Sequence, residues 1–330
     1  QTKKYFFLKI KNKALNELSI ELYENNKLLL ESRDRLVNLF EQTPVSILEE
    51  DFSEVIALLT KKKKEVPDLK KYLDKNYCIG VPTETVYGLA ANAYKNSAVK
   101  KIYNLKKRPK NNPLIVHYHD IDSLKKDCLI NDNFIKLYKK FSPGPITYVL
   151  QLKKNSKISK YVTNNKKSLA VRFPKHTIFK NLLKQLDYPL AAPSANITTK
   201  VSAVNAKDVK EEFGNKIKYI LDGGTCAIGI ESTIVNLTAR PTILRLGGLD
   251  ISKIQKALGF KMNISTNPKK KIAPGQSRLH YSPGIPLRMN VTKPKNDEAF
   301  IIIKKKKTKP KNYFYLTSKS NLDEAAKKLY

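Results

Sequence analysis

Between residues 66 and 258, short apolar runs alternate with stretches in which apolar residues recur at helical spacing. This alternation predicts an α/β domain, because a buried strand needs a short apolar run and a helix needs one apolar face. The apolar runs predict strands at 77–81, 113–118, 146–152, 168–173, 189–192, 218–221, 232–236 and 243–246. The periodic stretches predict helices at 98–105, 133–141, 178–186, 206–213 and 251–258.

The pattern changes on both sides of this region, which we place at 61–262. Residues 1–60 have leucines at loosely helical spacing and no recognisable chemistry, so we predict an extension of unknown role. Residues 263–284 are polar and contain proline and glycine without periodicity, which predicts a linker. Residues 285–330 predict only a partial C-terminal domain, with two strands and one helix at 299–303, 312–316 and 322–329.

The charge is strongly positive, with 63 Lys+Arg against 29 Asp+Glu and a formal net charge of +34. Such a charge favours polyanionic partners such as RNA or nucleotides. Lysine, asparagine and isoleucine are all abundant, however, so a drift in composition explains the charge equally well. Arginine is rare, and each one is a candidate for a bidentate contact that lysine cannot make. The arginines stand at positions 33, 35, 108, 172, 240, 245, 278 and 288.

Several classes of protein do not fit the sequence. Its 3 cysteines are far apart and odd in number, so they form no disulfide or zinc framework. His117 and His119 would share one face of a strand, which suits either a metal site or an ordinary exposed strand face. No apolar run is long enough to span a membrane, and no secretory pattern is present, so we predict a cytoplasmic protein. Walker, dinucleotide-binding and GxSxG motifs are also missing.

Two stretches could carry chemistry near the start of the domain. Residues 82–89 read PTETVYGL and place hydroxyls, a carboxylate and a phenol after a strand, where α/β sheets bind ligands. The alternative is a strand-to-helix turn with Thr83 or Thr85 as the N-cap. In residues 106–113, an extended segment would point Lys106 and Arg108 at one anion, and two prolines would stiffen it. The alternative there is a basic surface loop.

Further polar residues follow apolar strands downstream. Arg172 is predicted to lie in a buried strand and therefore needs a carboxylate or phosphate partner, from the protein or from a ligand. Ser194 and Asn196 follow the strand at 189–192, where a turn or a helix cap is the alternative interpretation. Because no glycine cradle exists, a phosphate would be held by side chains. The candidates are Lys106, Arg108, Arg172 and Arg245.

These segments, in this order, resemble the YrdC-domain family, the L-threonylcarbamoyl-AMP synthases. The matching pieces are PTETVYGLAANA (82–93), KKRPKNNPLIVH (106–117), SPGPIT (142–147), LAVRFPKH (169–176), APSAN (192–196), GIEST (229–233) and LRLGG (244–248). APGQSRLHYSP (273–283) resembles the linker of the family's longer form. The resemblance implies a YrdC-like twisted mixed sheet flanked by helices, with an anion-binding cavity, a linker and a truncated Rossmann-like C-terminal part. The chain departs from the family at Ile197–Val201, where Ser-Gly and a nearby proline are usual.

The resemblance also implies an activity: L-threonine, bicarbonate and ATP give threonylcarbamoyl-AMP and pyrophosphate. Threonylcarbamoyl transferase proteins would then modify tRNA. By similarity, Thr85, His117, Arg172, Ser194 and Ser232 would bind threonine. The nucleotide would be bound by Arg108, Asn112, Ser168, Asn196, Val204, Arg245 and Tyr281. Lys106 would join Arg108 on the phosphates as a catalytic residue, and Mg2+ would bind through the ATP phosphates without protein ligands.

Two alternatives stay open at this point. A YrdC-like module that binds RNA, including double-stranded RNA, without synthesis would fit the charge but would not need the retained site residues. A carbamoyl-transfer relative from hydrogenase maturation would need zinc-finger cysteines, which this chain does not have. For the synthase we expect Arg108→Ala to abolish synthesis with little loss of stability, because the loop is predicted to be exposed.

Overall fold

A computed structural model describes residues 69–265, 286–304, 312–317 and 321–329. The predicted extension 1–60 and most of the predicted linker, including Tyr281, lie outside the described residues. The strands are β1 (Ile79–Val81), β2 (Gly88–Asn92), β3 (Ile115–His117), β4 (Ile146–Gln151), β5 (Ser168–Arg172), β6 (Leu190–Ala191), β7 (Thr233–Asn236), β8 (Thr242–Arg245), β9 (Asn263–Ile264), β10 (Phe300–Lys304) and β11 (Tyr313–Thr317). The helices are α4 (Asn96–Leu105), α5 (Ile121–Lys125), α6 (Asp132–Phe141), α7 (Lys160–Thr163), α8 (Thr177–Lys184), α9 (Ala206–Phe213), α10 (Ile251–Leu258) and α11 (Leu322–Lys327).

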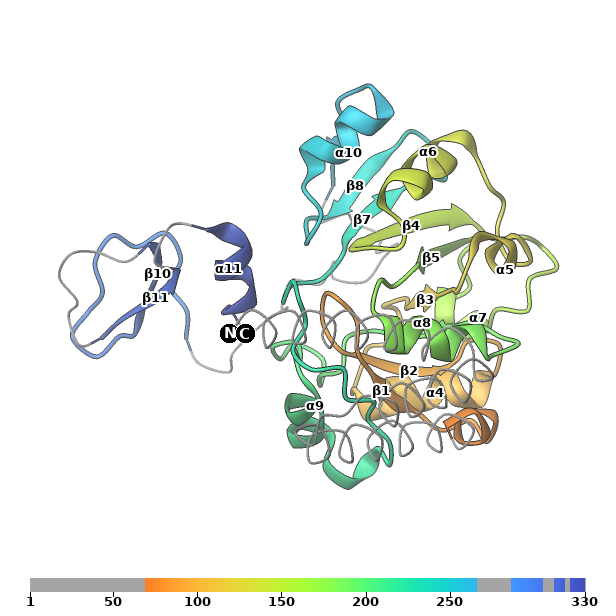
Figure 1. Cartoon of the computed structure of the whole chain (residues 1–330), viewed down its shortest axis with the longest axis horizontal. Helices are drawn as coiled ribbons and strands as arrows, with labels where there is room; N and C mark the ends of the chain where they lie inside the picture. Colours follow the sequence, from red (N-terminus) through yellow and green to blue (C-terminus); the bar gives the residue numbers. More distant parts are fainter. Residues whose placement is uncertain (1–68, 266–285, 305–311, 318–320, 330) are drawn as a thin grey trace, which may run out of the picture. The chain divides into compact units, whose positions relative to one another are not determined.

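Nine strands form one mixed sheet in the order β1-β2-β6-β3-β5-β4-β7-β8-β9 (Figure 1). The pairs β3/β5, β4/β7 and β8/β9 are parallel, and the others are antiparallel. The predicted mixed α/β fold with flanking helices is therefore confirmed. Because the strands run in both directions, no single edge of the sheet collects all the carboxyl ends.

The two faces of the sheet are buried differently. Val116, Val171 and Tyr148 lie on one face and belong to the large core, which also contains residues of α4, α6 and α10. Side chains alternate along a strand, so the residues next to them point to the opposite face. That face has a small apolar cluster formed by Ile115, Val149, Ala170, Ile234 and Leu244. On this face, β3 continues from Ile115 to His117 and β5 from Ala170 to Arg172, so polar side chains lie next to the apolar cluster.

The structure adds three short elements that were not predicted, α5, α7 and β9, and differs from the predicted elements at two longer stretches. Residues 88–92 are the buried strand β2 and not the start of a helix, so Thr83 and Thr85 are not N-cap residues. The run at 218–221 is not a full strand among the described residues, because only Ile220 makes a bridge, to Gly80. The absent side chain of Gly80 permits that approach, since a Cβ there would lie 3.0 Å from Ile220.

The buried carboxylate of Asp127 connects three segments of the chain through hydrogen bonds. Asp127 is 1% exposed, and its Oδ2 accepts hydrogen bonds of 2.9 Å from the hydroxyls of both Tyr94 and Tyr118. Its Oδ1 accepts from Ser156 Oγ at 2.6 Å. Burial, together with the nearby carboxylate, raises the pKa of Tyr118 well above its ordinary value. The hydroxyls are therefore held as donors to Asp127.

We expect Asp127→Asn to lower the free energy of unfolding by roughly 1–3 kcal/mol, because an amide nitrogen would face a hydroxyl donor and one buried partner would be unsatisfied. Urea unfolding followed by circular dichroism measures this change. Asp187→Asn is the matched control, since the Asp187 side chain is 93% exposed. Equal midpoints for the two variants would contradict a stabilising role for Asp127.

The C-terminal part has a small two-stranded sheet of its own. Strands β10 and β11 pair in parallel, with Phe300 opposite Tyr313 and Ile302 opposite Tyr315. Phe300 is buried, as is Ala325 of α11. The two strands and the helix predicted for this part are therefore all present, with ends that differ by a few residues. In the part of the chain that the structure describes, no helix has both the length and the apolar character needed to cross a bilayer.

Candidate functional site

A cavity opens on the face of the sheet that has the small apolar cluster. Its empty space, counted out to the open mouth, is about 480 Å³. The lining residues are Thr83, Val86, Tyr87, Gly88, Arg108, Ile115, His117, Arg172, Ala192, Pro193, Ser194, Glu231, Ser232 and Arg245. Among them, His117 and Arg172 end β3 and β5, whereas Glu231 and Ser232 precede β7, so the mixed sheet brings different strand ends to one place. Three arginines against Glu231 make the lining cationic.

Register explains why His117 and Arg172 meet in this cavity. The two residues are direct partners in the parallel pair β3/β5, and Thr147 of β4 is the antiparallel partner of Arg172. All three therefore point to the same face. His117 is 2% exposed, and neither ring nitrogen has a hydrogen-bond partner among the described residues. Burial, with the nearby Arg172 charge, lowers the pKa of His117 well below its ordinary value, so the ring is neutral at pH 7.

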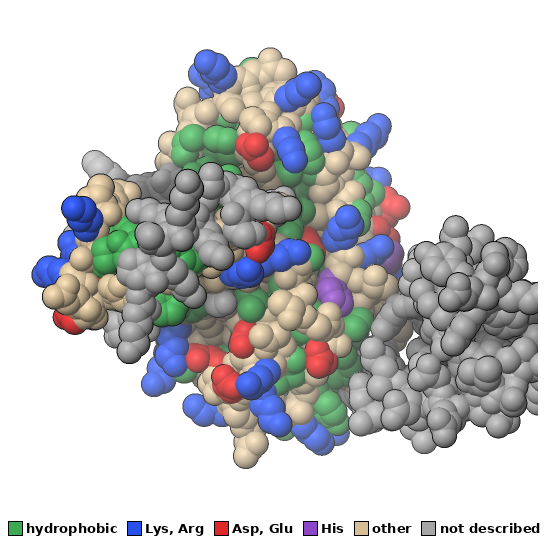
Figure 2. All heavy atoms as spheres, turned by 60° about the vertical axis from the view of Figure 1, so that its left-hand side comes forward, with side chains coloured by type: hydrophobic (Ala, Val, Ile, Leu, Met, Phe, Trp, Pro, Cys, Tyr) green, Lys and Arg blue, Asp and Glu red, His purple; other side chains and the backbone are tan. Residues whose placement is uncertain are grey.

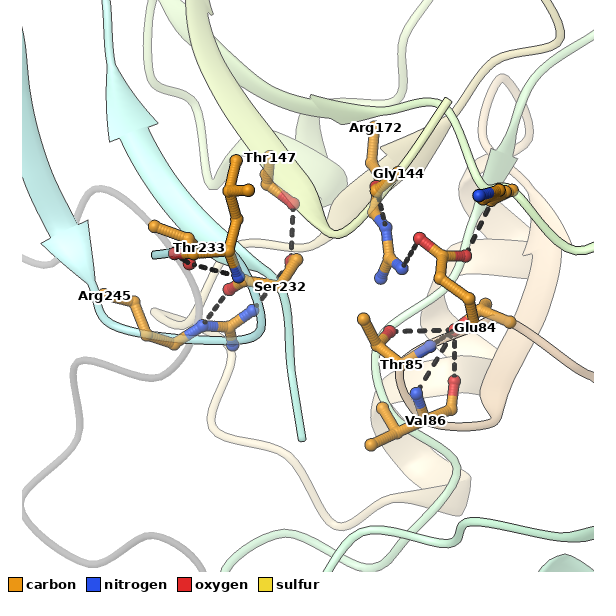
Figure 3. Close-up of polar contacts among 12 residues, drawn as sticks. Glu84, Thr85, Val86, Gly144, Thr147, Arg172, Ser232, Thr233 and Arg245 are labelled. Carbon is orange, nitrogen blue, oxygen red and sulfur yellow. Dashed lines mark hydrogen bonds and ion pairs between the residues drawn. The ribbon is translucent and has the colours of Figure 1, made fainter. Parts of the chain in front are cut away.

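The sequence left open whether buried Arg172 pairs with an anion of the protein or of a ligand. In the structure its partner is a protein carboxylate. Its Nη2 donates to Oε1 of Glu84 at 2.8 Å, and the two side chains are 5% and 8% exposed (Figure 3). The Lys175 backbone N–H holds the other carboxylate oxygen at 2.9 Å. Burial alone would raise the pKa of Glu84, but the charge and hydrogen bond of Arg172 outweigh it and lower that pKa below its ordinary value. Glu84 therefore stays ionised and fixes the guanidinium.

The turn before β2 positions Glu84. The Thr83 hydroxyl accepts hydrogen bonds from the backbone N–H groups of Thr85 and Val86 at 3.1 and 3.2 Å. It also donates to the Val86 carbonyl at 2.7 Å, which closes the turn. The Thr85 Oγ1 lies 2.8 Å from Thr83 Oγ1 and is fully buried. Thr85 thus lies behind the cavity lining and not in it, while Thr83 lines the cavity.

A second polar group lies at the start of β7. Ser232 Oγ lies 2.7 Å from Thr147 Oγ1 and accepts from Arg245 Nη2 at 3.1 Å. Arg245 Nε donates to the Ser232 carbonyl at 3.0 Å. A Cβ at Gly247 would meet the backbone of Glu231 and Ser232, so this close approach of the LRLGG segment requires glycine. Figure 3 shows this group and the Arg172–Glu84 pair as separate clusters.

The basic loop after α4 differs from the predicted extended, exposed segment. Lys106 is the C-cap of α4, and Lys107 has a φ of 48°, so the two cations do not point the same way. Arg108 is only 9% exposed; its Nε donates to the Asn112 carbonyl at 3.1 Å and its Nη2 to the Pro113 carbonyl at 2.9 Å. Burial lowers the pKa of Arg108 to about 10, which leaves it charged at pH 7. The expectation of an exposed Arg108 was wrong.

Among the described residues, the remaining predicted nucleotide ligands do not line the cavity. Asn112 is 2% exposed, and its Oδ1 has no partner among the described residues. Ser168 lies at the far end of β5, about 13 Å along the strand from Arg172. Val204 already uses its backbone, because its N–H donates to Asp208 and its carbonyl accepts from Cys226. Their roles, with those of Thr85, Lys106, Asn196 and Tyr281, stay predictions.

The structure adds residues that sequence reasoning did not assign to the site. Glu84 is the ionic partner of Arg172, Thr147 is the neighbour of Ser232, and Glu231 lines the cavity and accepts from Ser202 Oγ. Glu84 stands in the polar PTET stretch, and a buried arginine needs an acid, so a signal for this pair was available. Within the described residues, no cluster of three or more His, Cys, Asp or Glu side chains could hold a metal ion. His119 instead pairs with Asp120 at 3.4 Å, apart from His117.

Comparison with known proteins identifies the two parts of the chain. Residues 71–247, more than half of the chain, match the family model for Sua5, YciO and YrdC, described as telomere recombination. Residues 249–330 match the model described as the threonylcarbamoyl-AMP synthase C-terminal domain.

Two curated relatives are named threonylcarbamoyl-AMP synthase. The protein from Schizosaccharomyces pombe is 38% identical over 63% of this chain, and that from Pyrococcus abyssi is 40% identical over 64% of it. The matches span 59% and 64% of those two proteins, less than two thirds of either.

A solved structure extends the likeness to the fold. The crystal structure of P. abyssi Sua5 complexed with L-threonine has a TM-score of 0.71 and 31% identity, and the match covers 80% of this chain and 83% of that one. The mixed α/β fold thus agrees with the structure comparison. We conclude that this chain belongs to the Sua5/YciO/YrdC family.

Proposed function

We propose that this chain synthesises threonylcarbamoyl-AMP from L-threonine, bicarbonate and ATP, and releases pyrophosphate. One observation carries the proposal: three arginines converge on a cavity in a chain that shares its fold with a Sua5 protein solved in complex with L-threonine. Arg108, Arg172 and Arg245 suit this reaction because ATP and bicarbonate are anions and threonine carries a carboxylate. The threonine amine also becomes an anionic carbamate. A neutral His117 beside them adds a polar group without further positive charge.

The chemistry needs positioning and charge neutralisation more than a protein nucleophile. Bicarbonate takes up a proton and loses water to give CO2, and the threonine amine adds to the CO2 carbon and loses a proton to become a carbamate. A carbamate oxygen then attacks the α-phosphorus of ATP, and pyrophosphate leaves. Arg172, with Ser194 and Ser232, would hold the threonine and carbamate part, and Arg108 and Arg245 would neutralise the phosphates. Asn112, Ser168, Asn196, Val204 and Tyr281 belong to the nucleotide part of this proposal by resemblance only.

Mg2+ belongs to the proposal as part of the substrate. The described residues supply no cage of carboxylates, and Mg2+ commonly binds ATP through phosphate oxygens and water. Threonylcarbamoyl transferase proteins that modify tRNA are the proposed recipients of the product. The cytoplasmic location stays a prediction.

Pyrophosphate release tests the proposed activity directly. We expect the chain, with ATP and Mg2+, to release pyrophosphate only when both L-threonine and bicarbonate are present, and to form threonylcarbamoyl-AMP detectable by mass spectrometry. Omitting either co-substrate is the control. No release from folded protein that still binds ATP would contradict the synthase proposal.

The RNA-binding alternative predicts a different result. It predicts that the chain binds RNA with an affinity that falls steeply as the salt concentration rises. It also predicts no threonine-dependent release of pyrophosphate. Figure 2 shows lysine and arginine side chains scattered over one face among acidic, polar and apolar ones, and not gathered in one patch. That distribution gives no support to a dedicated RNA surface on the face shown, whereas the cavity supports the synthase.

A further inference from the structure

Lys106 occupies an unusual position for a lysine. It follows α4 directly, is 1% exposed and does not line the cavity. Lysine is almost never fully buried unless its charge is compensated. Burial, followed by the nearby Arg108 charge, lowers the pKa of Lys106 well below its ordinary value. Burying a lysine ammonium costs free energy, so the neighbouring acceptors must compensate its charge.

All the contacts of the Lys106 ammonium in the described structure lead to one segment. Its Nζ donates to the Ser194 carbonyl at 2.6 Å, to the Asn196 carbonyl, and to Asn196 Oδ1 at 3.4 Å. An ammonium has three N–H donors, so these acceptors use them all. The Lys106 carbonyl also accepts from Thr198 N–H at 2.8 Å. Lys106 therefore ties the end of α4 to residues 194–200, which we call the 194–200 loop.

Asn196 organises the 194–200 loop from within. Its Nδ2 donates to the carbonyls of Ile197 and Lys200 at 3.0 and 2.7 Å, and its Oδ1 accepts from Ser194 Oγ at 2.6 Å. The loop thus folds around Asn196, and Lys106 anchors that centre to the helix. Ser194 at the start of the loop lines the cavity. A change at Lys106 would therefore reach the cavity through Ser194.

We infer that Lys106 is a positioning residue, which sets the 194–200 loop and thereby Ser194 for the amino acid, and that it does not contact the triphosphate. This inference rests on the proposed function for the identity of the amino acid. It also differs from the role expected from the resemblance, in which Lys106 joins Arg108 on the phosphates. The departure of this chain from its family falls in the same loop, at Ile197–Val201.

The test is threonine binding in the absence of any nucleotide or phosphate. We expect Lys106→Met, in the full chain, to raise the Kd for L-threonine about tenfold, as measured by calorimetry. A tenfold change corresponds to roughly one net hydrogen bond, which is the contribution expected from a loop held in its binding conformation. Lys106→Gln keeps an amide donor and should give a smaller loss. Lys110→Met is the matched control, because Lys110 is exposed on the same loop.

Hydrogen exchange of backbone amides supplies a readout that needs no ligand. In Lys106→Met we expect faster exchange within the 194–200 loop and unchanged exchange in β3, β4 and β5. If wild-type protein bound no threonine, the proposed function would fail, while the exchange result would still decide whether Lys106 sets the loop. Unchanged threonine affinity and loop exchange, with weaker ATP binding, would overturn the inference in favour of a phosphate contact. Faster exchange throughout the sheet would also overturn it, by showing a general structural role.

Discussion

Replacing Arg172 by methionine is expected to lower the free energy of unfolding by roughly 3–5 kcal/mol, because it leaves Glu84 as an unpaired buried charge. The same variant should release pyrophosphate about 10²–10³ times more slowly, the typical cost of removing one preorganised donor. Urea unfolding and the threonine-dependent assay measure the two effects. They have separate causes: Glu84 and the Gly144 carbonyl hold Nη2 and Nε of Arg172, whereas the activity depends on Arg172 lining the cavity.

The pH dependence of the Arg172→Met variant identifies the cause of the instability. In the wild type, the pKa of Glu84 lies below its ordinary value, so its contribution to stability is constant from pH 5 to 8 and is lost only at more acidic pH. Without Arg172, burial raises that pKa, and the folded state is stabilised only while Glu84 is protonated. The stability difference between variant and wild type should therefore grow as the pH rises from 5 to 8.

A double variant separates stability from activity. Glu84→Gln added to Arg172→Met removes the unpaired charge and should restore most of the lost stability. It should not restore pyrophosphate release, because the donor for the substrate is still absent. Recovery of activity in the double variant would show that Arg172 serves only to neutralise Glu84. A pH-independent loss of stability would point to lost packing instead of an unpaired carboxylate.

Apolar patterning predicted most of the strands but not β2 or the two-residue β9. Strand β2 reads GLAAN, is fully buried and has small side chains, so it lacks the alternation or bulky run that indicates a strand. It also follows a polar turn that resembles a helix cap. The run at 218–221 shows the opposite error, because its apolar residues pack beside Gly80 with only one bridge. Local pattern cannot distinguish a packed segment from a paired strand.

For the candidate site, residue type and spacing indicated Arg108, Arg172, Ser194 and Arg245, the family resemblance added His117 and Ser232, and the structure brings these six together. They could be predicted because the motifs are specific. The need of a buried Arg172 for an acid was a signal available in the sequence, but the choice of Glu84 among the acids could not be established, because the two residues are 88 positions apart. The direction of Lys106 could not be predicted either, although the helix end at 105 was, because its Nζ contacts residues 194 and 196, about 90 positions further along the chain.

The second large effect is expected at Arg108. Arg108→Ala should reduce pyrophosphate release about 10²–10³-fold, because the guanidinium lines the cavity where the phosphates would lie. Its burial changes the expected stability, however. The Pro113 carbonyl would lose its donor, and the Asn112 carbonyl would keep only the Tyr103 hydroxyl. We therefore expect a loss of roughly 1–3 kcal/mol and not the small loss predicted for an exposed loop.

Arg108→Lys separates the two roles, because lysine keeps the charge but cannot donate in the planar fork that reaches both carbonyls. We expect it to lose less stability than Arg108→Ala and still to be strongly impaired, with a raised KM for ATP and a nearly unchanged threonine affinity. Arg240→Ala is the control, since Arg240 is exposed and outside the cavity. If Arg108→Ala unfolded more easily but kept full activity in its folded fraction, Arg108 would be a loop anchor alone. The cationic charge of the cavity would then have to come from Arg172 and Arg245, of which Arg172 is already neutralised by Glu84.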